Sequence, residues 1–524
     1  MNQAEVKRKQ IQLYSYATCV LVLLYFGSIF GNSGMTCFVV ALESLMIFLQ
    51  VGCGNMADVF GKMLRYRRKR GLYANVCAVR RRLIVLLSVL AVLCFALMFG
   101  LSDILANSFW QVSMAGLIIR ILSPIVLIRM GTCILQGHFQ SFGSHVQTTI
   151  GYLLRPVLYL VLGKALCTKK MLYGEKVANL LHNEEFRGMY GAVGVAAALI
   201  IAELIVLALM LLFYFISDRN SDRKKSREGL QQKESVAETL TTFSRLSGIN
   251  IGIGLLAHLL VVTIIFLLEE KNIIGIYFGT YLAVGALPVL IIGARFYLLY
   301  AKTIYALKGQ NTRHVKELVE LGLKYTWCFG ILACVILAVL APQITATYFE
   351  RNEVVERLLQ QGSVLVPLVL IWIYFLMINA AYGRYVYLIG ALLLNFIVYL
   401  LMGNFLKNKI ETELSSALVA AIIAISFGTL VLGTITINMY RLQVEFIYTF
   451  ILPLACAGLI GLILMAGSKI ITPHIGNEVC FYTCSILGLL LYLFLLGVCR
   501  TFSERDINQL YGKVGRKCLS VFFR

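Results

Sequence analysis

Long apolar runs recur along the whole chain, and they constrain its fold more than any other feature. A run of about 20 apolar residues can cross the roughly 30 Å hydrocarbon core of a bilayer as one helix. Every backbone polar group in lipid must be bonded internally, so such runs form helices. We therefore predict an all-α integral membrane protein. Its fourteen expected spans are roughly 11–31, 35–61, 83–101, 109–136, 146–165, 191–216, 246–268, 273–300, 321–341, 354–379, 385–404, 414–440, 446–467 and 479–499.

The composition agrees with a membrane protein. Hydrophobic residues make up 59% of the chain and charged residues 14%, whereas soluble domains are about 45–50% apolar and about 25% charged. No stretch leaves room for a sizeable soluble domain, which disfavours catalysis in water and favours transport. The formal charge of +21 would also fit a nucleic-acid-binding protein. Basic residues of multi-pass proteins gather in cytoplasmic loops, however, so we expect no nucleic-acid partner.

The cysteines indicate neither a metal site nor a disulfide framework. The chain has 14 cysteines, most of them single residues inside apolar runs, where cysteine behaves as a small hydrophobic residue. No CxxC motif occurs, and Cys480 and Cys484 have no histidine close by in the sequence. We expect no metal and no cofactor. The first apolar run lacks a small-residue cleavage site, so we expect a retained helix rather than a signal peptide.

The basic residues are distributed unequally between the two faces of this arrangement. When basic residues at the ends of spans are assigned to the adjacent face, 32 of the 47 lysines and arginines fall on one face and 11 on the other, and four arginines lie deeper within spans. Because cytoplasmic loops carry the excess of basic residues, we predict a multi-pass protein of the plasma membrane with both termini in the cytoplasm. The basic segment 62–82, which contains RYRRKRG, is expected to be solvated, to lie against anionic membrane lipids and to have no substrate role.

The chain repeats itself at an interval of about 240 residues. Pro124 lies within LSPIVLI, and Pro367 lies within the similar LVPLVLI. Two later spans begin with GAVGVAAALI and SSALVAAIIA. The segment 166–190 is expected to be an external loop without a counterpart. Six spans per repeat give parallel lobes related by a pseudo-twofold axis along the membrane normal. The expected divisions are an N-terminal lobe (1–216), a cytoplasmic linker (217–245), a C-terminal lobe (246–440), and two extra helices with a basic cytoplasmic tail (441–524).

Several stretches in combination resemble the MOP flippase superfamily, in particular its polysaccharide-export and stage V sporulation protein B-like members. GNMADVFGKMLRYRRKRGLYANVCAVRRRL resembles the family's loop after helix 2. SPIVLIRMGTCILQGHFQSFGSHVQTTIGYLLRPVLYLVLG is similar to its helix 4–5 hairpin. GAVGVAAALIIAEL and SSALVAAIIAISFG resemble its helix 6 and helix 12 openings. The turn INAAYGRYVYLIG departs from the family, because it is short and lacks a glycine-lysine-proline element.

The resemblance implies a transporter rather than an enzyme. Such a flippase carries a polyprenyl-pyrophosphate-linked oligosaccharide, or another cell-wall or polysaccharide precursor, from the inner to the outer leaflet. Two lobes alternate access around a central and often cationic cavity. The partners implied are the lipid-linked glycan, a coupling ion and glycan-assembly enzymes.

Arginines inside the expected spans indicate where a substrate would bind. A charge at the bilayer centre costs at least about 2.5–3.5 kcal/mol, so such residues usually face a cavity or a partner. Arg120 lies about ten residues into span 109–136, roughly 15 Å deep at 1.5 Å per residue. Arg155 lies at a similar depth in the next, antiparallel span. Two planar guanidinium groups at one level would match a pyrophosphate, so we predict that they form an anion clamp.

Five further residues complete the candidate site. Arg129 and Arg295 are predicted either to line the cavity or to extend to the membrane surface. Glu43 and Glu203 are expected to be charge partners of the arginines, or else to be released or protonated during turnover. His258 is either a hydrogen-bonded helix contact or a coupling residue, since histidine titrates near neutral pH.

Two other classes of protein are alternatives. A cation-coupled multidrug exporter of the same superfamily would need buried carboxylates, yet span 11–31 has none. Four arginines against two glutamates within the spans would repel a cationic drug and attract a phosphate. A membrane-embedded polyprenyl-sugar transferase would need catalytic residues on a substantial external loop, and segment 166–190 shows no recognisable catalytic pairing. The residues therefore favour the flippase.

Overall fold

The computed structural model describes residues 3–216, 234–349, 352–407, 409–410, 412–503 and 505–510. Nearly all of them are helical, and none of them forms a strand. Twelve helices are long and apolar enough to cross a membrane. The number rises to 13 if the bent pair Glu353–Gly362 and Leu365–Ala381 counts as one span. The predicted class, an all-α multi-pass membrane protein, is confirmed.

The first helix, α1 (Gln3–Gly52), covers the expected span 11–31 and most of the expected span 35–61, whose last residues lie in α2 (Met56–Lys69). A continuous helix of its 50 residues would be about 75 Å long at 1.5 Å per residue, more than twice the hydrocarbon thickness. Gly31 breaks it, with φ +69° and ψ −172°, a conformation that glycine adopts without a steric penalty. The break allows α1 to cross twice. The total of fourteen spans stays a prediction.

The chain forms two compact units. The N-terminal unit comprises residues 29–279, and the C-terminal unit comprises residues 1–28 and 280–524. The division into lobes at the linker 217–245 stays a prediction, and residues 217–233 of that linker lie outside the described part of the chain.

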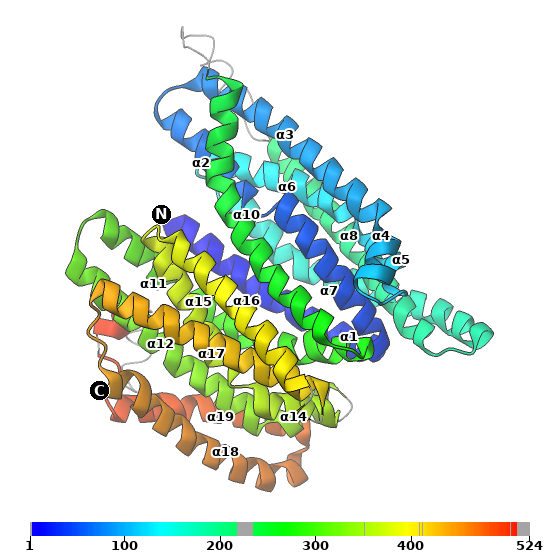
Figure 1. Ribbon diagram of the computed structural model, residues 1–524, viewed down its shortest axis with the longest axis vertical. Coiled ribbons are helices and arrows are strands. Elements are labelled where there is room, and N and C mark those ends of the chain that lie inside the picture. The colour runs from blue at the N-terminus through cyan, green and yellow to red at the C-terminus, as the bar shows by residue number, and fades with distance from the viewer. Residues whose placement is uncertain are drawn as a thin grey trace. The chain divides into compact units, whose positions relative to one another are not determined.

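Helices of the N-terminal unit that follow α1 are shown in Figure 1. They are α2 (Met56–Lys69), α3 (Tyr73–Gly100), α4 (Ser102–Ile104), η1 (Leu105–Phe109), α5 (Ala115–Leu122), α6 (Pro124–Ser141), α7 (Val146–Leu181), α8 (Glu185–Ile216), α10 (Val236–Leu267), η2 (Lys271–Ile273) and most of η3 (Gly275–Leu282). The expected fourth span is divided at Pro124, because proline cannot donate the helix hydrogen bond: α5 ends at Leu122 and α6 begins at Pro124.

The C-terminal unit consists of the remaining helices, and α18 and α19 lie side by side in it (Figure 1). Its helices are α11 (Ala283–Lys308), α12 (Thr312–Val339), α13 (Ala341–Tyr348), α14 (Glu353–Gly362), α15 (Leu365–Ala381), α16 (Tyr385–Lys407), α17 (Glu413–Tyr440), η4 (Ile447–Ile451), α18 (Leu452–Ile475) and α19 (Asn477–Val498).

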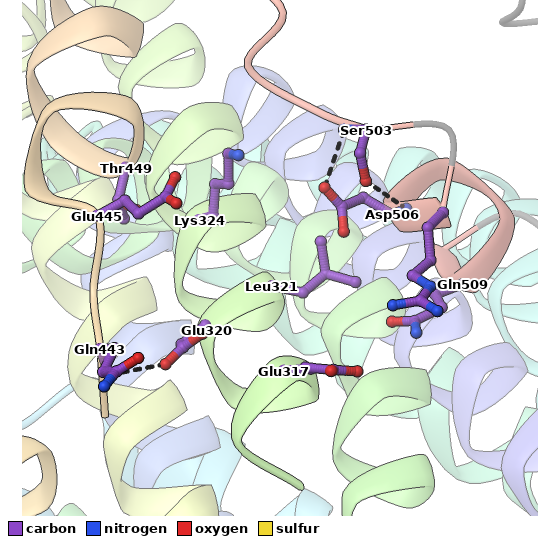
Figure 2. A pocket seen from close by; sticks show the side chains of 11 residues that line it. Glu317, Glu320, Leu321, Lys324, Gln443, Glu445, Thr449, Ser503, Asp506 and Gln509 are labelled. Carbon is purple, nitrogen blue, oxygen red and sulfur yellow. Dashed lines mark hydrogen bonds between the residues drawn. The ribbon is translucent and has the colours of Figure 1, made fainter. Parts of the chain in front are cut away.

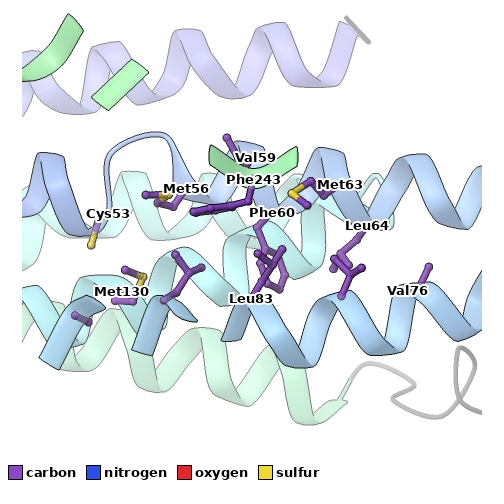
Figure 3. Close-up of a cluster of buried hydrophobic side chains, with 13 residues drawn as sticks. Cys53, Met56, Val59, Phe60, Met63, Leu64, Val76, Leu83, Met130 and Phe243 are labelled. Carbon is purple, nitrogen blue, oxygen red and sulfur yellow. The ribbon is translucent and has the colours of Figure 1, made fainter. Parts of the chain in front are cut away.

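A cluster of buried apolar side chains joins α2, α3, α6 and α10 within the N-terminal unit (Figure 3). Lipid tails are as apolar as these side chains, so helices in a membrane associate through close packing rather than through the hydrophobic effect. The cluster places the start of α10 against α2 and α3. Its members include Met56, Phe60, Leu64, Leu83, Leu87, Met130 and Phe243.

The prediction that segment 166–190 is an external loop is wrong, because this segment is helical. α7 continues to Leu181 and α8 begins at Glu185, so the two helices are 36 and 32 residues long. Two glycines let them pack closely. A Cβ on Gly174 would lie 2.9 Å from the carbonyl oxygen of Phe186, and one on Gly194 would lie 2.5 Å from that of Leu166. The charged residues of this segment therefore lie on a helical hairpin formed by α7 and α8 (Figure 1).

The basic segment 62–82 is not wholly solvated, contrary to expectation. Arg67 is buried, and its Nε and Nη2 donate to the carboxylate of Glu234 at 2.9 Å and 2.6 Å. Nη1 of Arg82 donates to the carbonyl oxygens of Glu234 and Ser235, at 2.8 and 3.0 Å, and to Oγ1 of Thr239 at 3.0 Å. These arginines anchor the beginning of α10, so part of the basic segment is structural.

Candidate functional site

Glu203 lies at the centre of a charged cluster inside the N-terminal unit. Its carboxylate is 1% exposed. Nε of Arg155 donates to Oε1 at 3.0 Å and lies 3.3 Å from Oε2. Nη1 of Arg129 is 3.6 Å from Oε1, and the hydroxyl of Tyr159 donates to the same oxygen. Two guanidinium groups thus surround one carboxylate, which leaves a formal charge of +1 in the cluster.

Three helices bring these residues together. Arg155 and Tyr159 are four residues apart on α7, and residues at this spacing share one helix face. Glu203 is on α8, which lies beside α7 (Figure 1). Arg129 is on α6, which also packs against α8. Glu203 is thus paired with arginines in the structure, as in one of the two alternatives expected for it.

The guanidinium of Arg155 uses only one edge on Glu203. Its Nη1 and Nη2 are buried and have no hydrogen-bond partner among the described residues. The ring of Tyr152 is on the same helix, with its centroid 5.4 Å from Cζ of Arg155. A buried, unbonded donor of a charged group is costly, by about 1–3 kcal/mol or more. The cluster therefore has both the charge and the free donors to receive an anion.

Arg120 lies nearer the beginning of its helix than the sequence predicts. α5 begins at Ala115 rather than near residue 109, so Arg120 is only about 7.5 Å along its helix at 1.5 Å per residue. Gln111, with φ +57°, lies in the turn that delays the helix. Nη2 of Arg120 is 2.6 Å from Oδ2 of Asp103, and its Nε donates to Oγ of Ser102 at 3.2 Å. The Arg120 and Asp103 side chains are 44% and 64% exposed.

Glu43 and His258 form a second pair within the same unit. Oε1 of Glu43 on α1 is 2.7 Å from Nδ1 of His258 on α10. Their side chains are 13% and 24% exposed. Glu43 is thus bonded to a histidine rather than to one of the predicted arginines. A hydrogen bond between a carboxylate and an imidazole needs a proton on one of the two bonded atoms.

Polar contacts on both sides of this pair join α1 to α10 and to the turn after it. Nε2 of Gln50 donates to the carbonyl oxygen of Asn250 at 3.0 Å. Nδ2 of Asn32 and Oγ1 of Thr36 donate to the carbonyl oxygen of Asn272, at 2.6 and 3.1 Å. The apolar sequence of these two spans contains no signal for their register. We call these contacts, with Glu43 and His258, the α1–α10 seam.

The remaining predicted arginine, Arg295, is exposed on α11 in the C-terminal unit. The structure therefore brings Arg129, Arg155 and Glu203 together, pairs Glu43 with His258, and places Arg120 with Asp103. Tyr159 is the member of the cluster that the sequence did not indicate, although its position one turn after Arg155 is a usable signal.

A polar cavity of about 300 Å³ lies in the C-terminal unit (Figure 2). The backbone N–H of Gln443 donates to Glu320 at 2.8 Å, and Ser503 and Asp506 bond each other reciprocally. The side chains of Glu317, Glu320 and Asp506 are already engaged in local contacts. No group of three or more histidines, cysteines or carboxylates suited to a metal ion occurs in the described residues. The lining residues are Glu317, Glu320, Leu321, Lys324, Gln443, Glu445, Thr449, Ser503, Arg505, Asp506 and Gln509.

Solved structures decide the fold. No protein-family model matches the sequence, and no curated protein matches it. An inward-facing multidrug resistance MATE family transporter of the MOP superfamily aligns with a TM-score of 0.65 at 15% identity, over 84% of this chain and 98% of that one. The chain has the MOP transporter fold. The lipid II flippase MurJ, in an inward closed conformation, aligns with a TM-score of 0.63 at 16% identity, over 95% of this chain and 97% of that one.

A third MOP-fold structure gives the same result at lower similarity. It is a mutant of the Vibrio cholerae MATE transporter VcmN, with a TM-score of 0.57 at 14% identity, over 84% of this chain and 98% of that one. Each of these matches spans nearly all of the other protein. The fold implied by the sequence resemblance is therefore confirmed.

Proposed function

We propose that the protein is a flippase that moves a phosphate-bearing, lipid-linked glycan or related precursor from the inner to the outer leaflet of the plasma membrane. The observation that carries this proposal is the unbalanced charge around Glu203. Arg129 and Arg155 supply two positive charges to one carboxylate, and Nη1 and Nη2 of Arg155 are free donors. Arginine recognises phosphate through such paired N–H groups.

The cluster is closed in this conformation, because the side chains of Arg155 and Glu203 are 3% and 1% exposed. A bulky substrate would reach it only after α6, α7 and α8 rearrange. Glu203 would then act as the resident counter-ion, which keeps the guanidinium groups paired until a phosphate replaces it. Arg120 and Arg295, both exposed, are proposed as further contacts along the route. We also propose that both termini are cytoplasmic.

The breadth of the structural likeness supports a flippase over an exporter. The MurJ alignment covers 95% of the chain, whereas each MATE alignment reported above covers 84%.

Translocation of a lipid-pyrophosphate-linked oligosaccharide into proteoliposomes tests the proposal. Arg155→Ala should abolish translocation while the protein still inserts, and Arg155→Lys should rescue it only in part, because lysine keeps the charge but loses the planar fork. If Arg155 merely neutralises Glu203, then Arg155→Ala combined with Glu203→Ala should restore most of the activity, because both members of the fully buried pair are removed and the remaining Arg129 is 23% exposed. Near-wild-type translocation by that double mutant would make Arg155 structural.

A cation-coupled multidrug exporter is the second candidate, and the Glu43–His258 pair favours it. A carboxylate within a membrane helix is the group that such a protein would need for a cation. Expression in a host that lacks its own efflux pumps distinguishes the two candidates. The flippase should confer no efflux of cationic dyes. Dye efflux that survives Arg155→Ala but is lost in Glu43→Gln would favour the exporter.

A further inference from the structure

A second cavity of the C-terminal unit, of about 240 Å³, lies where three helices end and one begins. α11, α15 and α17 end beside it, at Lys308, Ala381 and Tyr440, and α12 begins there at Thr312. The short turn that departs from the MOP pattern, INAAYGRYVYLIG, contributes to its wall. The lining residues are Leu307, Gln310, Asn311, Thr312, Val315, Lys316, Tyr382, Met439 and Tyr440.

The polar groups of this cavity are suited to an anion. Lys316 is the one charged residue in the lining, and no carboxylate lines it. The rings of Tyr382 and Tyr440 are stacked, with centroids 3.8 Å apart and planes at 19°. The hydroxyl of Tyr440 is buried and has no hydrogen-bond partner in the part of the chain that the structure describes. An ammonium group and a free hydroxyl donor therefore belong to the same cavity.

Helix polarity separates Lys316 from the other basic residues nearby. Lys308 and Arg441 lie at or just after helix C-termini, where a positive charge is favourable without any ligand. Lys316 lies in the second turn of α12, beyond the first turn in which the helix dipole acts most strongly. Glu320, one turn further along, interacts electrostatically with Lys316 and also accepts a hydrogen bond at the other cavity. A bound anion beside the start of α12 would interact favourably with the ammonium of Lys316 and with the partial positive charge of the helix N-terminus.

Apolar side chains form the rest of the wall, which distinguishes the ligand from a free inorganic ion. Leu307, Val315 and Met439 line the cavity, and the helix ends around it belong to candidate membrane spans. Tyrosine is frequent at the membrane–water interface, where its ring is in an apolar setting and its hydroxyl is hydrated. The ligand should therefore be amphipathic.

We propose that this cavity binds the phosphate of an anionic lipid headgroup, through the ammonium of Lys316, the hydroxyl of Tyr440 and the N-terminus of α12. The apolar wall receives the part of the lipid next to the phosphate. This site is separate from the Glu203 cluster, and it does not depend on which substrate the protein transports.

Native mass spectrometry of the full-length protein, titrated with phosphatidylglycerol or phosphatidylcholine, tests the proposal. Lys316→Ala and Tyr440→Phe remove the ammonium and the hydroxyl. Arg313→Ala is the matched charge control, because Arg313 is on the same helix and its side chain is 92% exposed. Tyr305→Phe is the matched hydroxyl control, because Tyr305 is 75% exposed. A hydrogen bond to a charged group contributes enough to change affinity about tenfold.

Lys316→Ala should lower the affinity for phosphatidylglycerol about tenfold, and Tyr440→Phe should lower it less, while both controls bind as the wild type does. Phosphatidylcholine should bind weakly to all variants. Equal retention of phosphatidylglycerol by Lys316→Ala and Arg313→Ala would overturn the proposal. Equal binding of the two lipids, or thermal protection by inorganic phosphate without any binding of phosphatidylglycerol, would also overturn it. Tyr440→Phe removes a single oxygen atom, so it tests the site even if Lys316→Ala fails to fold.

Discussion

Nε of Arg155 lies 3.0 Å from Oε1 of Glu203, and both side chains are almost fully buried. Arg129 approaches the same oxygen from α6 at 3.6 Å. One carboxylate therefore serves two guanidinium groups, and its removal has a different consequence from the removal of either arginine.

Glu203→Ala should destabilise the protein more than Arg155→Ala does. Removing one partner of a buried ion pair costs about 3–5 kcal/mol, because the other charge stays buried. Glu203→Ala removes the carboxylate that Arg129 and Arg155 share, whereas Arg155→Ala leaves Glu203 with Arg129 and the hydroxyl of Tyr159. Thermal unfolding of the purified variants measures the order. An equal or smaller effect of Glu203→Ala would show that the cluster is not held by this carboxylate.

Part of this cluster was predictable from the sequence. Few charged residues fall within the spans, and a charge in lipid needs a partner, so the pairing of Glu203 with an arginine follows from scarcity. The sequence does not indicate that Glu203 pairs with Arg129 and Arg155 rather than with Arg120. That pairing depends on the turn at Gln111, which delays α5 and leaves Arg120 beside Asp103.

Two other features show why the rest was not predictable. Mixed charge in segment 166–190 suggested a loop, yet the segment contains no proline and extends α7 and α8 as a helical hairpin. The pairing of Glu43 with His258 needs the register between two apolar helices whose residues are 215 positions apart. Apolar sequence does not specify such a register, because many alignments bury similar side chains.

Two glycines of the N-terminal unit should tolerate alanine very differently. A Cβ on Gly194 would lie 2.5 Å from the backbone oxygen of Leu166, so α7 and α8 would have to separate. A Cβ on Gly254 would meet only the flexible end of Gln50, at 1.9 Å from its Nε2. Gly194→Ala should therefore cost about 1–3 kcal/mol or more. Gly254→Ala should lose one hydrogen bond, about 1 kcal/mol, and regain a similar amount in helix propensity.

Thermal unfolding in detergent compares the two variants directly. Gly254→Ala combined with Gln50→Ala is the matched control, since it removes the side chain that the new methyl group would meet. If Gly254→Ala alone proves as damaging as Gly194→Ala, the α1–α10 seam is more rigid than its flexible contacts indicate.

His258→Leu should destabilise the α1–α10 seam by leaving the Glu43 carboxylate within a membrane helix without its partner. An uncompensated group of this kind costs about 2.5–3.5 kcal/mol at the bilayer centre, and less here because Glu43 is 13% exposed. The double variant His258→Leu and Glu43→Leu should recover most of the loss. Thermal unfolding of the three proteins gives the coupling between the two residues, and additive effects would show that the hydrogen bond contributes nothing.

The orientation of the protein in the membrane can be tested at two exposed positions of the N-terminal unit that are predicted to lie on opposite sides of the membrane. Arg70 is exposed in the turn between α2 and α3, and Leu180 is 78% exposed near the end of α7. A cysteine at position 70 in a cysteine-free background should react with a membrane-impermeant maleimide only in inverted vesicles, because 32 of the 47 basic residues lie on the face predicted to be cytoplasmic and such residues are retained there. A cysteine at position 180 should react only in intact cells. Labelling of position 180 from the cytoplasmic side would contradict the predicted orientation. Labelling of both positions from one side would contradict the odd number of crossings that the topology places between them.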